Sequence, residues 1–189
     1  MPEAATERSR SLVLIALFAA LTAVGAFVRV PLPTPVPFTL QVPAVLLAGL
    51  LLGPGRGAAS QLAYLAAGLV GLPVFAEGGG PAYLMKPTFG FLVGFVAGAA
   101  VTGVVAGDPA RCGTKRAALA LGCGIVAIYL VGVPWLGWNL AYVQQRPAAA
   151  ALAKMALVFF PLDLVKAALL IPVARAVRAR GGLPGSPVR

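Results

Sequence analysis

The sequence predicts an all-α integral membrane protein, a bundle of six transmembrane helices. Hydrophobic residues make up 60% of the 189 residues and charged residues only 11%, against about 25% charged in a soluble domain. The chain is long enough for six spans of about 20 residues each, joined by short loops. Most of its 15 Lys and Arg residues stand at the ends of apolar runs, which is typical of membrane topology. This placement argues against nucleic-acid binding despite the net charge of +10.

The first expected transmembrane helix covers residues 12–30 and follows a polar tail over residues 1–11. Its apolar run is too long for a signal-peptide core, so we expect it to remain as a span. It holds two overlapping Ala-x-x-x-Ala pairs, and small residues four apart let another helix approach closely. The alternative is that alanine is simply frequent here. The pairs are Ala16 with Ala20 and Ala19 with Ala23.

A proline-rich connection separates the first two expected spans. Four prolines between residues 31 and 37 predict an extended, non-helical segment over residues 30–38. Such a backbone is tolerated at membrane depth only where it is buried in protein or lines a cavity. A short second span over residues 41–52 follows and ends at a turn over residues 53–57.

The third expected span covers residues 58–72 and leads into a glycine-rich segment over residues 71–81. Glycine allows backbone conformations closed to other residues, so this segment suits a loop that closes over a site and reopens. It is not a phosphate-binding loop, because the Gly-Lys-Ser/Thr ending is absent.

The fourth and fifth expected spans cover residues 87–106 and 117–136. Gly90, Gly94 and Gly98 stand four apart in the fourth span and predict a helix-packing face. The fifth span ends in aromatic and amide residues typical of a membrane interface.

The sixth apolar run, residues 148–172, contains two opposite charges, Asp163 and Lys166. Each buried charge costs about 2.5–3.5 kcal/mol on insertion scales, and residues three apart share a helix face. Pro161, just upstream, lacks a backbone donor and predicts a bend. The pair is either a structural contact between helices or part of a polar binding site, which is the usual role of intramembrane charges.

The distribution of Lys and Arg predicts the orientation of the bundle. With six spans, only Arg29, Lys86 and Arg146 fall on the side away from the termini. We therefore expect both termini in the cytoplasm and the protein in the cytoplasmic membrane. The proline-rich, glycine-rich and aromatic connections then gather on the outer face above the charge pair, as in a ligand pocket open to the outside.

The expected ligand has N–H donors and a carbonyl or anionic oxygen, because a carboxylate accepts hydrogen bonds and an ammonium donates them. The chain has no histidine, and no nucleophile–base arrangement or metal cluster is visible. We therefore expect no enzymatic activity, no cofactor and no metal ion. Aromatic residues are available as apolar walls: Tyr64, Phe75, Tyr142 and Phe160.

Five stretches stand in a recognisable order: Pro-Val-Pro-Phe-Thr-Leu-Gln at 35–41, Ala-Gly-Leu-Leu-Leu-Gly-Pro at 48–54, Gly-Leu-Pro-Val-Phe-Ala at 71–76, Lys-Pro-Thr-Phe-Gly-Phe at 86–91 and Pro-Leu-Asp-Leu-Val-Lys at 161–166. Together they closely resemble the BioY family, the biotin-specific S components of energy-coupling-factor (ECF) transporters. The resemblance covers residues 12–177, and several motifs in order are far more specific than any one alone.

The resemblance implies a six-helix membrane domain over residues 12–177 that binds biotin, with cytoplasmic ends over residues 1–11 and 178–189. It implies a transmembrane coupling protein (T component) and two ABC-type ATPases as partners, and alanine pairs that face the coupling protein. It also implies that Asp163 and Lys166 belong to the ligand site. Dependence on the coupling module and self-association of the chain stay open.

Biotin meets the chemical demand of the charge pair, since it has ureido N–H donors, a carbonyl, an apolar fused ring and a carboxylate. We expect the Asp163 carboxylate to accept a hydrogen bond from a ureido N–H. We expect Lys166 to orient the Asp163 carboxylate or to donate to the ureido carbonyl. Lys86, nearer the mouth, is a candidate for the ligand carboxylate or else an interfacial anchor. The remaining ligand candidates are Gln41, Tyr64, Phe75 and Asn139, and Glu77 is expected on a solvated lid.

Two other functions stay open at this point. One is an S component for another vitamin, such as riboflavin or thiamine, with the same architecture and a different pocket. The other is a membrane interaction protein whose charge pair is structural. For Gln41, Tyr64 and Asn139, plain interhelical hydrogen bonding is the alternative to a place in the pocket.

Overall fold

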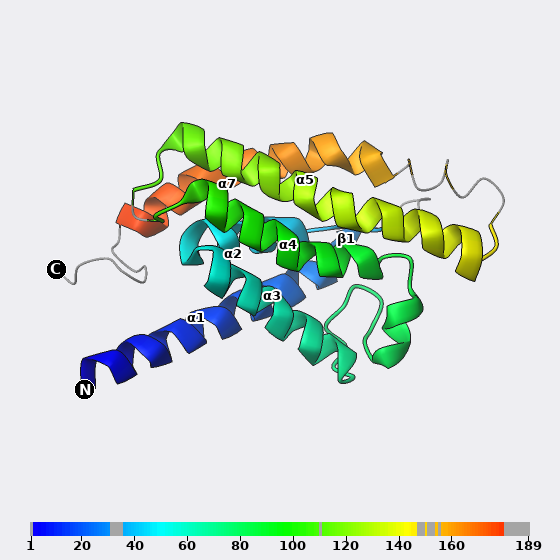
Figure 1. Ribbon diagram of the computed structural model, residues 1–189, viewed down its shortest axis with the longest axis horizontal. Coiled ribbons are helices and arrows are strands. Elements are labelled where there is room, and N and C mark those ends of the chain that lie inside the picture. The colour runs from blue at the N-terminus through cyan, green and yellow to red at the C-terminus, as the bar shows by residue number, and fades with distance from the viewer. Residues whose placement is uncertain are drawn as a thin grey trace.

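The computed structural model describes residues 2–30, 36–109, 111–146, 150, 154 and 156–179. Within that part of the chain, helices dominate, and the predicted all-α bundle is confirmed (Figure 1). The α-helices of the described residues are α1 (Pro2–Phe27), α2 (Gln41–Leu52), α3 (Pro54–Leu69), α4 (Phe89–Ala106), α5 (Thr114–Trp138) and α7 (Phe159–Ala179).

Short elements occupy the connections. Two strands, β1 (Arg29–Val30) and β2 (Phe38–Thr39), pair antiparallel on either side of the proline-rich segment. Of that segment, residues 31–35 lie outside the described part. The 3-10 helices are η1 (Pro81–Met85) and η3 (Ala156–Val158), and the π-helical turn η2 (Asn139–Val143) continues α5.

Helices α1 and α3 start earlier than expected. Helix α1 begins at Pro2, so the expected polar tail continues the first helix. Helix α3 begins at Pro54, directly after Gly53, so the predicted turn over residues 53–57 shrinks to one residue with a positive φ of 80°. Proline is well suited to the first helical position because its missing N–H would have no helical partner there. The Cα of Gly49 would crowd a side chain at Gly57, so glycine lets α2 and α3 pack closely.

Three helical segments in the described residues are long and apolar enough to cross a membrane: Ala5–Phe27, Phe89–Ala106 and Thr114–Val143. Helix α2 has 12 residues, a length of about 18 Å, against a hydrocarbon core of roughly 30 Å. Helix α7 has 21 residues but carries Asp163, Lys166 and Arg175. The short helix and the charged helix contact each other, so the least membrane-like parts of the bundle lie together.

The glycine stripe of α4 packs against α5, as predicted. A Cβ at Gly90 would meet the side chain of Trp135, and one at Gly94 would lie 2.7 Å from the backbone oxygen of Ile128. A Cβ at Gly98 would meet the Ile128 side chain. Only a hydrogen at these positions lets the two helices approach so closely.

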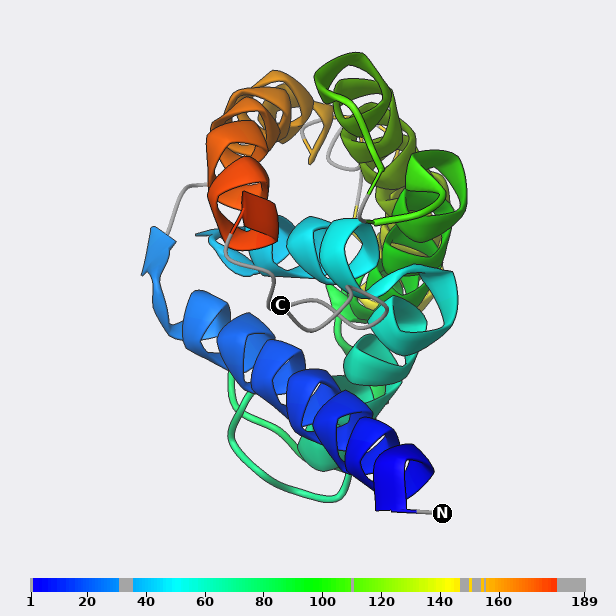
Figure 2. The same cartoon turned by 90° about the vertical axis from the view of Figure 1, so that its left-hand side faces the viewer.

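The helices enclose a central region around α2. Helix α1 lies on one side of α2 and α3, while α4, α5 and α7 lie on the other (Figures 1 and 2). The start of α1 and the end of α7 lie at the same end of the bundle (Figure 1), as an even number of crossings requires. Residues 71–88 connect α3 to α4 at the opposite end, which we call the loop end. The cytoplasmic location of the termini stays a prediction.

Candidate ligand-binding site

An open cavity lies between α2, α4, α5 and α7 and reaches the loop end. Most of its lining is aromatic or aliphatic, and its only charged members among the described residues are Asp163 and Lys166. The lining residues are Val36, Pro37, Phe38, Thr39, Gln41, Val42, Ala76, Tyr83, Thr88, Phe91, Leu92, Phe95, Ile128, Tyr129, Phe159, Asp163 and Lys166. A mostly apolar cavity with a few convergent polar groups is typical of a small-molecule site.

Asp163 and Lys166 form a close ion pair. Lys166 Nζ lies 2.5 Å from Asp163 Oδ1, and the side chains of Lys166 and Asp163 are only 13% and 5% exposed, respectively. The ammonium also donates to the backbone oxygen of Thr39 at 2.9 Å and lies 4.1 Å from the ring centroid of Phe38. Lys166 therefore joins α7 to β2 as well as neutralising Asp163.

Tyr129 completes the environment of the carboxylate. Its hydroxyl donates to Asp163 Oδ2 at 2.7 Å, and its ring packs edge-on against Phe91 and Phe160. Tyr129 was not among the site residues predicted from the sequence. The available signal was a tyrosine inside an apolar span, because a buried phenol needs a hydrogen-bond partner.

Pro161 does not interrupt the last helix. Helix α7 begins at Phe159, so Pro161 lies in its first turn. The backbone N–H groups of a first turn have no intrahelical partner, so proline costs nothing there. The bend predicted at Pro161 is therefore replaced by a helix start, and Asp163 follows in the next turn. Residues 148–149, 151–153 and 155, earlier in the predicted sixth span, lie outside the described part.

Gln41 lines the cavity and connects it to the loop end. Its Nε2 donates to the Tyr64 hydroxyl at 2.8 Å, and that hydroxyl donates to the backbone oxygen of Val74 at 3.1 Å. The Thr39 hydroxyl donates to Gln41 Oε1 at 3.1 Å. Tyr64 itself is buried behind Gln41 and is not in the cavity lining.

Phe75 anchors the glycine-rich segment. Its ring is 1% exposed and packs against Tyr64 and Tyr83, with centroids 5.3 Å and 4.6 Å away. Its backbone N–H donates to Gly78 O at 2.8 Å and closes a tight turn. The segment is thus a bonded, anchored turn. Phe75 lies behind the cavity wall, which its neighbour Ala76 lines.

Gly68→Ala is expected to lower stability by about 1–3 kcal/mol, the usual cost of overpacking. A Cβ at Gly68 would collide with the Phe75 ring, which has no room to move between its two tyrosine neighbours. Thermal unfolding of the purified protein in detergent measures the effect. The matched control is Gly122→Ala, because nothing lies within 4 Å of a Cβ there. Equal melting temperatures for the two variants would contradict the anchoring role of Phe75.

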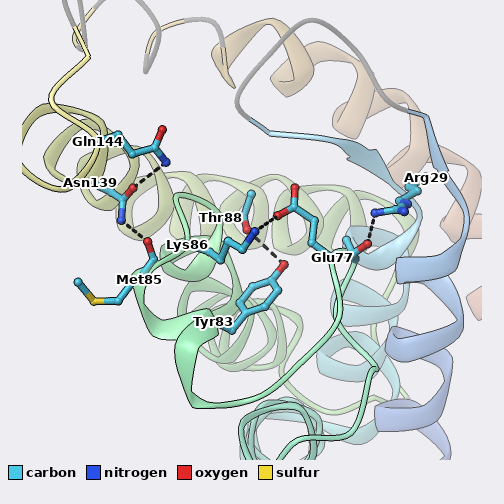
Figure 3. A network of polar contacts seen from close by, with 9 residues as sticks. Arg29, Glu77, Tyr83, Met85, Lys86, Thr88, Asn139 and Gln144 are labelled. Carbon is cyan, nitrogen blue, oxygen red and sulfur yellow. Dashed lines mark hydrogen bonds and ion pairs between the residues drawn. The ribbon is translucent and has the colours of Figure 1, made fainter.

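Asn139 holds the loop end together. Its Nδ2 donates to Met85 O at 2.8 Å, and its Oδ1 accepts from Gln144 at 3.3 Å (Figure 3). The Trp135 indole donates to Lys86 O at 3.1 Å. Asn139 is fully buried but is not among the cavity-lining residues. A direct contact between Asn139 and the ligand stays a prediction.

Lys86 is not among the residues that line the cavity. Its Nζ pairs with Glu77 Oε2 at 3.1 Å, with the side chains 47% and 38% exposed (Figure 3). Both residues line a second, more open cleft at the loop end. The Tyr142 side chain, expected as an apolar wall, is 75% exposed.

Tyr83 and Thr88 line the cavity where it meets the loop end, and neither was predicted from the sequence as a site residue. Their hydroxyl oxygens lie 3.3 Å apart. Burial raises the pKa of Tyr83 above its ordinary value, so the phenol stays neutral near pH 7. Both hydroxyls are thus available as uncharged hydrogen-bonding groups.

The alanine pairs of α1 fall on two different faces. Ala16 and Ala20 are exposed, whereas Ala19 and Ala23 are half-buried against the core. Only the first pair is therefore available to another protein, and its partner stays a prediction.

A protein-family model described as the BioY family matches residues 1–182. A probable biotin transporter BioY from Lysinibacillus sphaericus is 54% identical over 127 residues, which is 67% of this chain and 64% of that protein. A probable biotin transporter BioY from Pyrococcus horikoshii is 37% identical, with 90% of this chain and 98% of that protein covered. A crystal structure of the S-component for biotin from an ECF-type ABC transporter matches with a TM-score of 0.80 at 26% identity, covering 96% of this chain and 97% of that one.

Proposed function

The chain belongs to the BioY family, and we propose that it is the membrane subunit that captures biotin for uptake into the cell. It is a substrate-binding subunit and not an enzyme. The observation that carries the proposal is the buried Asp163–Lys166 pair at the wall of an otherwise apolar cavity. The hydrogen-bond donors and acceptors of this pair complement a cyclic urea, and the apolar wall of the cavity suits a fused ring.

The hydrogen-bonding capacity of the pair supports this assignment. Each carboxylate oxygen accepts about two hydrogen bonds, and in Asp163 one oxygen takes Lys166 while the other takes Tyr129. Each oxygen therefore has capacity left for a ureido N–H. An ammonium has three donors, of which Lys166 uses one on Asp163 and one on Thr39. The third is available for the ureido oxygen.

The remaining lining suits the rest of the ligand. We assign the fused ring to the aromatic wall formed by Phe91, Phe95 and Phe159. Gln41 supplies a further polar group at the wall. Tyr64 and Phe75 are assigned to a supporting layer, because their side chains hold Gln41 and the loop end in place. Asn139, which bonds Met85 O with its amide, remains a proposed ligand contact.

The context of the site follows from the same proposal. The protein lies in the cytoplasmic membrane with both termini in the cytoplasm, residues 12–177 form the biotin-binding domain, and the loop end faces outward. A T component and two ABC-type ATPases supply the energy, with Ala16 and Ala20 as the contact for the T component. The exposure of these two alanines on α1 supports that contact.

Isothermal titration of the purified, detergent-solubilised chain tests the function. We expect submicromolar binding of biotin and no binding of riboflavin or thiamine. Tight binding of riboflavin or thiamine would mean that the chain is an S component for that vitamin, with the same fold and a different pocket. No binding of any vitamin would overturn the proposal and favour a structural charge pair.

A further inference from the structure

We propose that the open cleft at the loop end is a capture site for the ligand's carboxylate, with Arg29 and Lys86 as the attracting groups and Glu77 as their competitor. This inference rests on the proposed function and adds to it a first binding step, outside the main cavity. Figure 3 shows the three side chains around the segment that follows Phe75.

The cleft adjoins the cavity. It is lined by residues of α1, β1 and the glycine-rich segment, together with Lys86. Ala76 lines both the cleft and the cavity. A ligand held in the cleft therefore lies next to the inner site, since Ala76 forms part of both walls.

The charges of the cleft do not balance. Lys86 is paired with Glu77 at 3.1 Å, while the Arg29 guanidinium donates to the uncharged backbone oxygen of Ala76. In the described ranges no carboxylate lies within ion-pair distance of Arg29. A guanidinium has five N–H donors in a planar fork that fits a carboxylate, so most of the donors of Arg29 are available to an anion.

The Lys86–Glu77 pair is suited to exchange. Both side chains are more than a third exposed, and ion pairs at such positions contribute little to stability. A carboxylate from solution can therefore replace Glu77 at small cost. The inner pair is different, because Asp163 is nearly buried and its negative charge disfavours a second carboxylate beside it. The ligand is thus oriented with its neutral ring inward and its carboxylate at the cleft.

Association rates of the full chain, measured by stopped-flow tryptophan fluorescence, test the capture site. We expect Arg29→Gln and Lys86→Gln to slow the binding of biotin about threefold to tenfold at low salt, because rim charges act on association rates. Glu77→Gln should accelerate it, and all three effects should shrink in high salt. Biotinamide, which lacks the charge, should bind at the same rate to every variant.

The control variant is Arg111→Gln. Arg111 is an exposed cation beyond the far end of α4, and its replacement should leave the association rates of biotin and biotinamide unchanged. Equal slowing of biotin and biotinamide, or unchanged biotin rates in all variants, would overturn the capture site while leaving the proposed function intact. Opposite signs for Glu77→Gln and Lys86→Gln exclude simple loosening of the loop, because both changes break the same ion pair. If neither ligand binds the wild-type protein, the proposed function fails and this assignment fails with it.

Discussion

Asp163→Asn is expected to weaken biotin binding by a factor of about 100 or more, which corresponds to about 2.7 kcal/mol. The substitution removes the negative charge that accepts the ureido N–H, and it leaves Lys166 as an unpaired ammonium at 13% exposure. Truncating one partner of a buried, hydrogen-bonded charge pair typically costs about 2–5 kcal/mol. Isothermal titration measures the loss, with far-ultraviolet circular dichroism as the check on the fold.

The matched control is Asp108→Asn. Asp108 also forms an ion pair three residues along, with Arg111 at 3.5 Å, but the side chains of Asp108 and Arg111 are 54% and 89% exposed. The same chemical change there should leave biotin binding unaltered. A folded Asp163→Asn variant that binds as tightly as the wild type would remove the carboxylate from the site.

The structural features that were predicted correctly follow from residue patterns within a single helix. The glycine stripe of α4 is readable because four-residue spacing puts Gly90, Gly94 and Gly98 on one face of any helix. The charges of α7 are readable because a carboxylate in an apolar run needs a partner, and the residue three positions along supplies it. Both inferences depend on a single helix, so no knowledge of the tertiary arrangement was needed.

The parts that were missed depend on how distant segments meet. Tyr129 becomes a partner of Asp163, 34 residues further along the chain, only because α5 packs on α7. Asn139 was expected at the ligand because it is a polar residue near the outer face. That contact stays a prediction; what could not be predicted is the hydrogen bond from its amide to the backbone of Met85, a partner that no side-chain pattern reveals.

Hydrogen bonds between described residues join the site to the loop end. Lys166 bonds the backbone of Thr39 in β2, and Arg29 in β1 bonds the backbone of Ala76. Gln41 bonds Tyr64, which bonds the backbone of Val74. A ligand that contacts Lys166 and Gln41 therefore contacts side chains that also hold β2 and the glycine-rich segment in place.

The double variant Asp163→Asn with Lys166→Met is expected to recover the stability that each single variant loses and to bind no biotin. Breaking a buried ion pair from one side costs about 3–5 kcal/mol because a charge is left unpaired, whereas replacing both charges is often neutral. The introduced amide oxygen would still accept the hydrogen bond from Tyr129, and the introduced thioether chain would fill the volume of the lysine stem. Thermal unfolding in detergent and isothermal titration of the same preparations measure the two quantities separately.

This double variant separates a binding pair from a structural one. If the charges serve only to hold α7 in the bundle, a protein that regains its stability should also regain its biotin affinity. If they contact the ligand, stability returns and affinity does not, because neither of the two introduced side chains carries the charge that the ureido group requires. A stable double variant with wild-type affinity would therefore place the biotin site elsewhere in the bundle.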